Sequence, residues 1–250
     1  MALNDTDAHR VRSIRLFRNV SDHHFTILLK SSSVRHFPRR ALLFNERDRA
    51  SSLYILLDGA IELFSEHQNR RSTIAVIRTI KPIALTLIVD DVNPVSACTI
   101  ERSELLAIPL RVIHDLIDAD PWFARTITYE LAGHLRDIIE DFKNHKLRTT
   151  IERLAEWILR CDLDAGGTGH FMLPYGKRVL ASHLGMAPEN LSRNLASLAA
   201  LGVTVHGRQV SLNNRAALAE LARVEVEAGD TCPHAGESPP TAPIAPLLAR

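Results

Sequence analysis

The sequence predicts an α+β protein in which a strand-rich N-terminal half, one long helix and a small helical domain follow each other along the chain. Three observations support this class. Short apolar runs separated by turn residues lie between Val34 and Pro109, a helical period begins at Pro121, and two short helices with a hairpin lie between Tyr175 and Leu212. A length of 250 residues suits two domains.

The composition is that of a soluble globular protein, with 46% hydrophobic and 24% charged residues. A net charge of +1 excludes a globally basic nucleic-acid coat but leaves room for a local basic face. No apolar run approaches the roughly 18–20 residues that span a bilayer, and the start lacks a signal-peptide pattern, so we expect a cytoplasmic protein with no membrane contact. Three cysteines without a CxxC pair favour neither a disulfide framework nor a zinc site.

The N-terminal half is expected to start with short helices between Asp5 and Ser33, one of them capped by Ser21. The clearest strands lie between Leu53 and Phe64, where Asp58-Gly59 separates two apolar runs and predicts a β-hairpin. Further strands are predicted at Thr73–Ile80, Ala84–Val89, Val95–Ile100 and Glu104–Ile108. Regular short strands at this spacing are typical of a barrel or sandwich.

The long helix is predicted to begin with Asp120 as its N-cap and Pro121 at its first position. Its apolar residues recur at alternating spacings of three and four, as in a coiled-coil seam. Because the strand domain before it is already closed, we expect this seam to join two copies of the chain, although one more core helix is the alternative. The expected seam consists of Ile127, Leu131, His134, Ile138 and Phe142. A second helix is predicted from Lys146 to Cys161.

The third segment reads as a helix-turn-helix. Helices are predicted at Lys177–Leu184 and Pro188–Leu198, with Gly185 in the tight turn between them. Their apolar residues face each other, which leaves Glu189, Ser192 and Arg193 on the exposed face of the second helix. Strands at Val203–His206 and Gln209–Leu212 then form a hairpin across Gly207, which completes a winged helix.

The exposed face carries chemistry suited to reading DNA, because residues near the start of a recognition helix reach base edges in the major groove. Arg193 can bond guanine O6 and N7, Glu189 can accept from cytosine N4, and Ser192 can do either. The alternative is an ordinary surface ion pair between Glu189 and Arg193.

The same segment is locally basic. Between His170 and Leu212, Glu189 is the one acidic residue, against four Lys and Arg residues. We expect three of these basic residues, Lys177, Arg178 and Arg208, to contact DNA phosphates.

The motif Glu-Asn-Leu-Ser-Arg at residues 189–193 and the order of elements from Phe17 to Leu221 resemble the CRP/FNR superfamily of bacterial transcription regulators, in the form found in its fumarate–nitrate regulator branch. The resemblance implies a homodimer that reads a TTGAT-like inverted repeat in double-stranded DNA. It also implies activation, with the Leu163–Gly169 loop touching RNA polymerase. One departure is Ala187, where the family usually has a Ser or Thr cap, and losing that cap costs roughly 1 kcal/mol.

The resemblance also implies the domain boundaries. Residues 1–120 would form a β-roll sensor, a jelly roll of the cyclic-nucleotide-binding type, and residues 121–146 the dimerisation helix. Residues 147–225 would form the winged helix-turn-helix. The proline-rich residues 226–250 are expected to be disordered.

The effector is less defined than the DNA-reading surface. Family members that bind cyclic AMP carry a Phe-Gly-Glu motif and a following Arg, whereas Ile83, Ala84, Leu85 and Val95 stand at those positions here. A buried phosphate without its cation is strongly disfavoured, so we do not expect cyclic AMP. The family's cluster cysteines near the N-terminus are absent, which argues against an iron–sulfur cluster.

A bound haem and a domain with no effector are both left as alternatives. The histidines in or near the sensor half are His23, His24, His36 and His67, and His134 lies on the long helix. A cyclic-nucleotide-type regulatory module that acts only through protein contacts is a further alternative. No HExxH, GxSxG, phosphate loop or paired-carboxylate spacing occurs, so we expect neither an enzyme nor a metal site.

Overall fold

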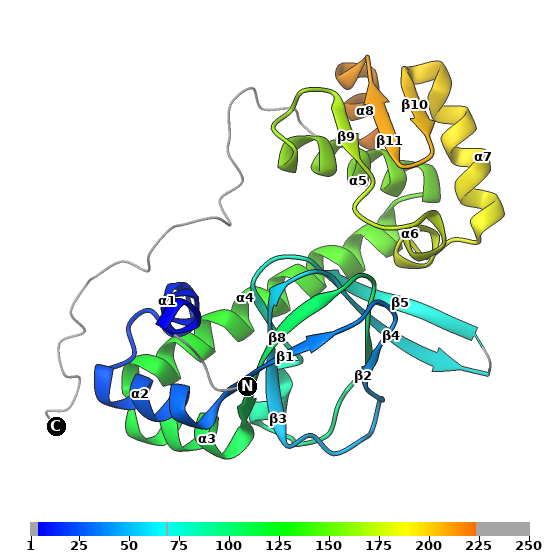
Figure 1. The fold of residues 1–250 in the computed structure, drawn as a ribbon. Coiled ribbons are helices and arrows are strands. Elements are labelled where there is room, and N and C mark those ends of the chain that lie inside the picture. Colours follow the sequence, from blue (N-terminus) through cyan, green and yellow to red (C-terminus); the bar gives the residue numbers. More distant parts are fainter. Residues whose placement is uncertain (1–4, 69, 224–250) are drawn as a thin grey trace, which may run out of the picture.

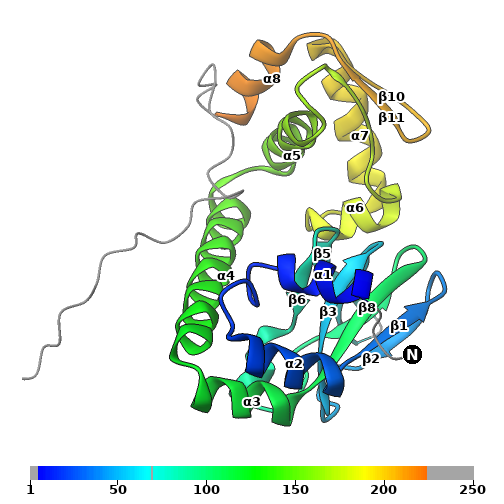
Figure 2. The same ribbon diagram turned by 60° about the vertical axis from the view of Figure 1, so that its left-hand side comes forward.

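The structure is a computed structural model that describes residues 5–68 and 70–223. The expected disorder of residues 226–250 lies outside the described residues. A β-roll flanked by helices occupies the N-terminal half, a long helix α4 (Pro121–Leu147) runs beside it, and a small C-terminal domain sits over one end of the roll (Figures 1 and 2). The predicted α+β class and its three parts are confirmed.

The roll consists of two four-stranded sheets whose neighbouring strands are antiparallel, in the orders β1-β8-β3-β6 and β2-β7-β4-β5. Its strands are β1 (Ser33–Phe37), β2 (Leu42–Phe44), β3 (Ser52–Asp58), β4 (Ile61–His67), β5 (Arg70–Ile77), β6 (Lys81–Ile83), β7 (Ser96–Thr99) and β8 (Ser103–Pro109). Helices α1 (Asp5–Ser13), α2 (Asp22–Ser31) and α3 (Leu110–Ala119) flank the roll. Ser21 caps α2 as predicted, by accepting from the His24 backbone N–H.

The expected hairpin at Asp58-Gly59 is wrong. β3 pairs with β8 and β6, whereas β4 pairs with β5 and β7, so the chain changes sheets at this turn. Gly59 has a φ of +98°, and a Cβ at this position would lie 2.4 Å from Ser103 Oγ. The Asp-Gly pair therefore marks a left-handed turn pressed against β8, and that local signal is the same for a hairpin and for a crossing between sheets.

One further expectation in the roll is wrong, and one helix was not predicted. The predicted strand Ala84–Val89 is instead a 3-10 helix, η1 (Leu85–Ile88), which follows the short strand β6. Leu85 and Leu87 are both buried, and a short apolar run of this kind has no period that separates strand from helix. The helix α3 was not expected at all.

The long helix α4 begins as predicted, because the Asp120 side chain accepts from the backbone N–H groups of Trp122 and Phe123, and Pro121 occupies the first turn. It ends at Leu147, and α5 (Thr150–Asp164) starts after a break, so the predicted start of the next helix at Lys146 is wrong. Thr149 and Glu152 form a reciprocal capping box that fixes the new start.

The five residues of the expected seam lie in different surroundings along α4. Ile127 is only 4% exposed and belongs to the core of its own subunit, and Leu131 packs against the same core. His134 is half-buried beside Lys81. Ile138 and Phe142 are exposed, and together with Leu135 and Ile139 they form an apolar stripe on the second half of the helix.

The C-terminal domain has its own core, which includes Leu154, Leu180, Leu191 and Leu218, all no more than 1% exposed. After α5 it contains β9 (His170–Met172), α6 (Lys177–His183), α7 (Pro188–Leu198), the 3-10 turn η2 (Ala199–Leu201), β10 (Val203–His206), β11 (Gln209–Leu212) and α8 (Arg215–Ala222). The predicted bounds of α7 and of both wing strands are confirmed. Among the described residues, no helix is long and apolar enough to cross a membrane.

Candidate nucleic-acid interface

The recognition helix α7 is held to the domain by its apolar side. Leu191 and Leu198 are at most 1% exposed, and Leu195 packs against the same core. The helix starts at Pro188 without a side-chain cap, as expected from Ala187. Gly185 in the turn before it has a φ of +65°, as the sequence predicted for a left-handed residue.

The opposite side of α7 carries Glu189, Ser192 and Arg193, and all three are exposed. Ser192 Oγ donates to the Pro188 carbonyl at 3.1 Å, and the Arg193 guanidinium donates to Asn190 Oδ1. In the described part of the chain, no ion pair joins Glu189 to Arg193. The Glu189 carboxylate is therefore available to an external donor rather than to its helix neighbour.

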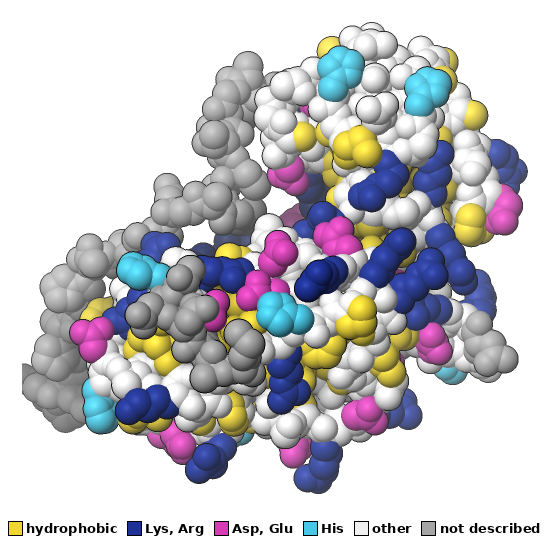
Figure 3. All heavy atoms as spheres, in the orientation of Figure 1, with side chains coloured by type: hydrophobic (Ala, Val, Ile, Leu, Met, Phe, Trp, Pro, Cys, Tyr) yellow, Lys and Arg dark blue, Asp and Glu magenta, His cyan; other side chains and the backbone are white. Residues whose placement is uncertain are grey.

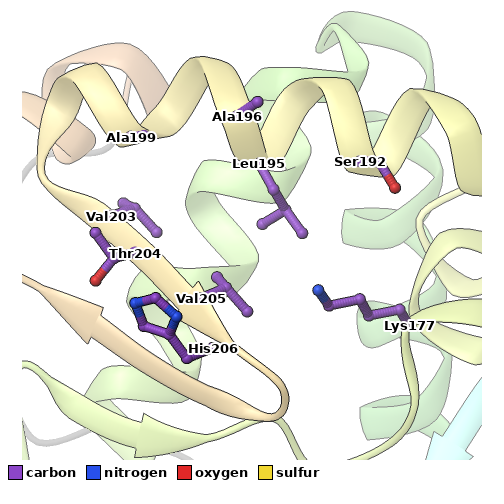
Figure 4. A pocket seen from close by; sticks show the side chains of 9 residues that line it. All are labelled: Lys177, Ser192, Leu195, Ala196, Ala199, Val203, Thr204, Val205 and His206. Atoms are coloured by element: carbon purple, nitrogen blue, oxygen red, sulfur yellow. The ribbon is translucent and has the colours of Figure 1, made fainter.

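A groove of about 300 Å³ runs between α7 and the wing strand β10 (Figure 4). Leu195, Val203 and Val205 give it apolar walls, and the Lys177 side chain extends toward it from the start of α6. Its polar lining residues are Lys177, Ser192, Thr204 and His206. His206 was not predicted as a site residue, although its place next to the wing glycine Gly207 is a signal in the sequence that indicates it.

The expected phosphate contacts occupy two places. Lys177 and Arg178 are exposed in the first turn of α6. Arg208 lies in the wing turn, but its Nε and Nη2 donate to the Leu173 carbonyl at 2.9 and 2.6 Å, so part of its guanidinium fixes the wing to the chain after β9. Figure 3 shows Lys and Arg side chains gathered where this domain meets the β4–β5 hairpin.

A buried carboxylate shapes the loop after α5. Asp162 is 1% exposed, its Oδ1 accepts from the Gly169 backbone N–H at 2.7 Å, and its Oδ2 lies 3.4 Å from Arg215. Its backbone carbonyl also accepts from the Gly167 N–H. Asp162 therefore holds the middle and the end of the glycine-rich loop, a role that no pattern in the sequence indicated.

The joint between α4 and the helix-turn-helix contains two histidines. His183 Nδ1 is hydrogen-bonded to Tyr175 Oη at 2.6 Å, and burial lowers the pKa of His183. Burial, followed by the nearby Arg153 charge, also lowers the pKa of His145, which lies against Gly185. Burial therefore favours the neutral form of both imidazoles.

The interior of the roll does not suit a phosphate. Leu85, at the position where a nucleotide-binding relative would carry the Glu of its motif, is only 2% exposed, and Ile83 close by is 1% exposed. Ile83 belongs to an apolar cluster with Leu56 and Leu105, against which Tyr54 packs. An anion placed among these side chains would lose its hydration without gaining a cation.

A helix with an exposed carboxylate, hydroxyl and guanidinium, backed by a basic winged domain, defines a DNA-binding protein of the helix-turn-helix class. The family pattern of the Crp-like helix-turn-helix domain matches residues 152–221, and that of the cyclic nucleotide-binding domain matches residues 34–120. The chain belongs to the CRP/FNR superfamily of transcription regulators, whose members are not enzymes.

Solved structures share this fold. A regulatory protein from Silicibacter pomeroyi DSS-3, whose name describes cAMP binding, is 28% identical, with 86% of this chain and 99% of that chain covered and a TM-score of 0.58. FixK2 from Bradyrhizobium japonicum is 22% identical, with coverages of 79% and 99% and a TM-score of 0.69. A CooA mutant from Carboxydothermus hydrogenoformans is 16% identical, with coverages of 88% and 97% and a TM-score of 0.70. No curated protein matches the chain.

Proposed function

We propose that this regulator is a homodimer that reads a TTGAT-like inverted repeat through α7. The observation that carries the proposal is that α7 has one buried apolar side and one exposed polar side. Its apolar side is buried in the domain core, and Glu189, Ser192 and Arg193 are exposed together on the other side.

The three side chains differ in what they can bond. The Arg193 guanidinium suits guanine O6 and N7, and the unpaired Glu189 carboxylate suits the cytosine N4 amino group. Ser192 already donates its hydroxyl proton to Pro188, so toward DNA it acts as an acceptor. A hydroxyl that only accepts selects the amino groups of cytosine or adenine.

The apolar stripe on the second half of α4 supports the dimer. Leu135, Ile138, Ile139 and Phe142 are between 48% and 63% exposed and share one face of the helix. Pairing this face with a second copy would bury it and bring two α7 helices to successive major grooves. The half-sites would then lie one helical turn, about 34 Å, apart.

The roll would serve as a sensing or degenerate effector domain, and the loop fixed by Asp162 would be the surface offered to RNA polymerase. One relative is named for cAMP binding, but the apolar interior of this roll does not suit that ligand. A haem-based sensor is the alternative, which an absorption spectrum of freshly purified protein checks through the Soret band of haem.

The test compares two basic residues with different roles. Arg193→Ala should weaken binding to the inverted repeat by roughly 1–3 kcal/mol and relax discrimination at one base pair, whereas Lys177→Ala should weaken binding to all sequences alike. Fluorescence anisotropy with the repeat, single-base variants and scrambled DNA measures both. If Arg193→Ala discriminates between bases as well as the parent, the assigned reading role is wrong.

A further inference from the structure

The middle of strand β5 contacts the helix-turn-helix of the same chain. In both ribbon views α6 lies over this end of the roll (Figures 1 and 2). The Thr73 backbone N–H donates to Ser182 Oγ on α6 at 2.8 Å. β5 is an edge strand, paired to β4 alone, so its outward N–H groups need partners from outside the sheet. Ser182 supplies one of them.

A second contact lies at the end of the same strand. Arg78 Nη1 donates to the Pro174 carbonyl at 2.5 Å, just before α6, and its Nη2 lies 3.1 Å from Glu101 on the roll. The guanidinium thus bridges the two domains with a charge-assisted hydrogen bond on one side and an ion pair on the other. Val76 and Ile100 of the roll add apolar contact with the C-terminal core.

Thr73 is also fixed from inside the sheet. Its Oγ1 donates to Glu62 Oε1 at 2.6 Å, and Glu62 Oε2 accepts from Arg71 at 2.7 Å. Arg71 in turn reaches Cys98 Sγ on β7 at 2.9 Å. Thr73 and Glu62 are 4% and 7% exposed, whereas Arg71 is exposed, so this polar network across three strands has a buried half at Thr73 and Glu62. A shift among β4, β5 and β7 would therefore move the N–H that Ser182 accepts.

We propose that β5 is a docking surface for the helix-turn-helix domain and that Ser182 and Arg78 set the direction of α7. The base-reading side chains stay exposed while α6 is docked, so the contact orients the recognition helix and does not block it. A movement of the sheet can therefore be passed to α7 through this contact, without passing through the joint between α4 and α5. The inference rests on the proposed reading of DNA for its consequence, but the docking contact itself is testable without DNA.

The first test is amide hydrogen exchange of the full-length protein. Ser182→Ala should speed exchange at the Thr73 amide by at least about tenfold, because its acceptor is removed, while the amides of β8 keep their rates. Ser197→Ala, the same change on α7 at a site away from β5, is the matched control. An unchanged Thr73 rate in Ser182→Ala overturns the docking contact, whatever the protein does with DNA.

The second test varies the spacing between half-sites. In Arg78→Ala/Ser182→Ala, the preference for the best spacing over one base pair more or less should fall by about fivefold, while affinity for a single half-site stays within about twofold. Arg70→Ala, the same charge change on an exposed residue of β5, should leave the profile as it is. A variant profile with the parental shape overturns the orienting role. A parent that does not prefer the inverted repeat to scrambled DNA overturns the proposed function instead.

Discussion

The two halves of α4 show how one apolar helix divides its contacts. In the first half, Phe123 is 1% exposed and stacks on Phe17 with ring centroids 6.0 Å apart, and Ile127 is buried nearby. In the second half, the side chains of Leu135 and Phe142 are 58% and 61% exposed. The apolar residues of α4 therefore pack in the core of their own chain at the start of the helix and are exposed further along it.

The largest expected effect is at the buried half. Phe123→Ala should lower the free energy of unfolding by about 3–5 kcal/mol, because it leaves a cavity beside Phe17. Phe142→Ala is the matched change on the exposed half and should alter the stability of the monomer by less than about 0.5 kcal/mol. Denaturant unfolding at a protein concentration low enough to keep the chain monomeric measures both. Equal losses would erase the distinction between the halves.

The next effect concerns association. Leu135→Glu/Ile139→Glu should raise the dimer dissociation constant at least about a hundredfold, because charges replace the centre of the apolar stripe. Leu147→Glu makes the same kind of change on a side chain that is 77% exposed and lies off the stripe. Sedimentation equilibrium distinguishes them. A stable dimer in the double variant would place the interface elsewhere.

The smallest effect is a pH dependence that differs between the two ends of α4. At the start, burial alone would raise the pKa of Asp120, but hydrogen bonds from Phe123, Ser21, His24 and Trp122 lower it below its usual value. Its contribution to stability is therefore present above the unfolded pKa of about 3.9 and is lost as the pH falls through the folded value.

At the other end, His145 and His183 also have lowered pKa values, in both cases chiefly because of burial. The unfolded chain protonates them more readily, so their contribution to stability is complete above about pH 6.5 and declines as the pH falls below it. Asp141 partly offsets the shift of both histidines, and Arg153 near His145 and Arg160 near His183 add to it. His183→Gln should reduce the slope of the unfolding free energy against pH between pH 7 and 5, relative to the control His67→Gln. An unchanged slope contradicts this account.

The sequence predicted α7 and the wing to the residue because their signals are local. Pro188 marks the first turn of a helix, and Gly207 marks a tight turn between two short strands. The Glu189–Arg193 motif then needed only the helical period to place its side chains on one exposed face.

The failures involve partners that are distant in the sequence. Asp58-Gly59 predicts a turn, but β3 pairs with the distant strand β8 and not with β4, the strand that follows the turn. The seam itself stays a prediction: the periodicity of α4 shows which residues are apolar, but it does not show that Ile127 packs in the N-terminal core of its own chain. The docking of β5 on α6 has no local signal, because a threonine N–H and a serine hydroxyl are unremarkable until the fold joins them.

The placement of α6 over β5 also bears on solubility. An uncovered edge strand can template pairing with another chain, and natural proteins cover or charge such edges. Here the DNA-binding domain contacts the middle of β5, where the Thr73 N–H already donates to Ser182. The roll separated from that domain would expose this edge, so the C-terminal domain also protects its neighbour against self-association.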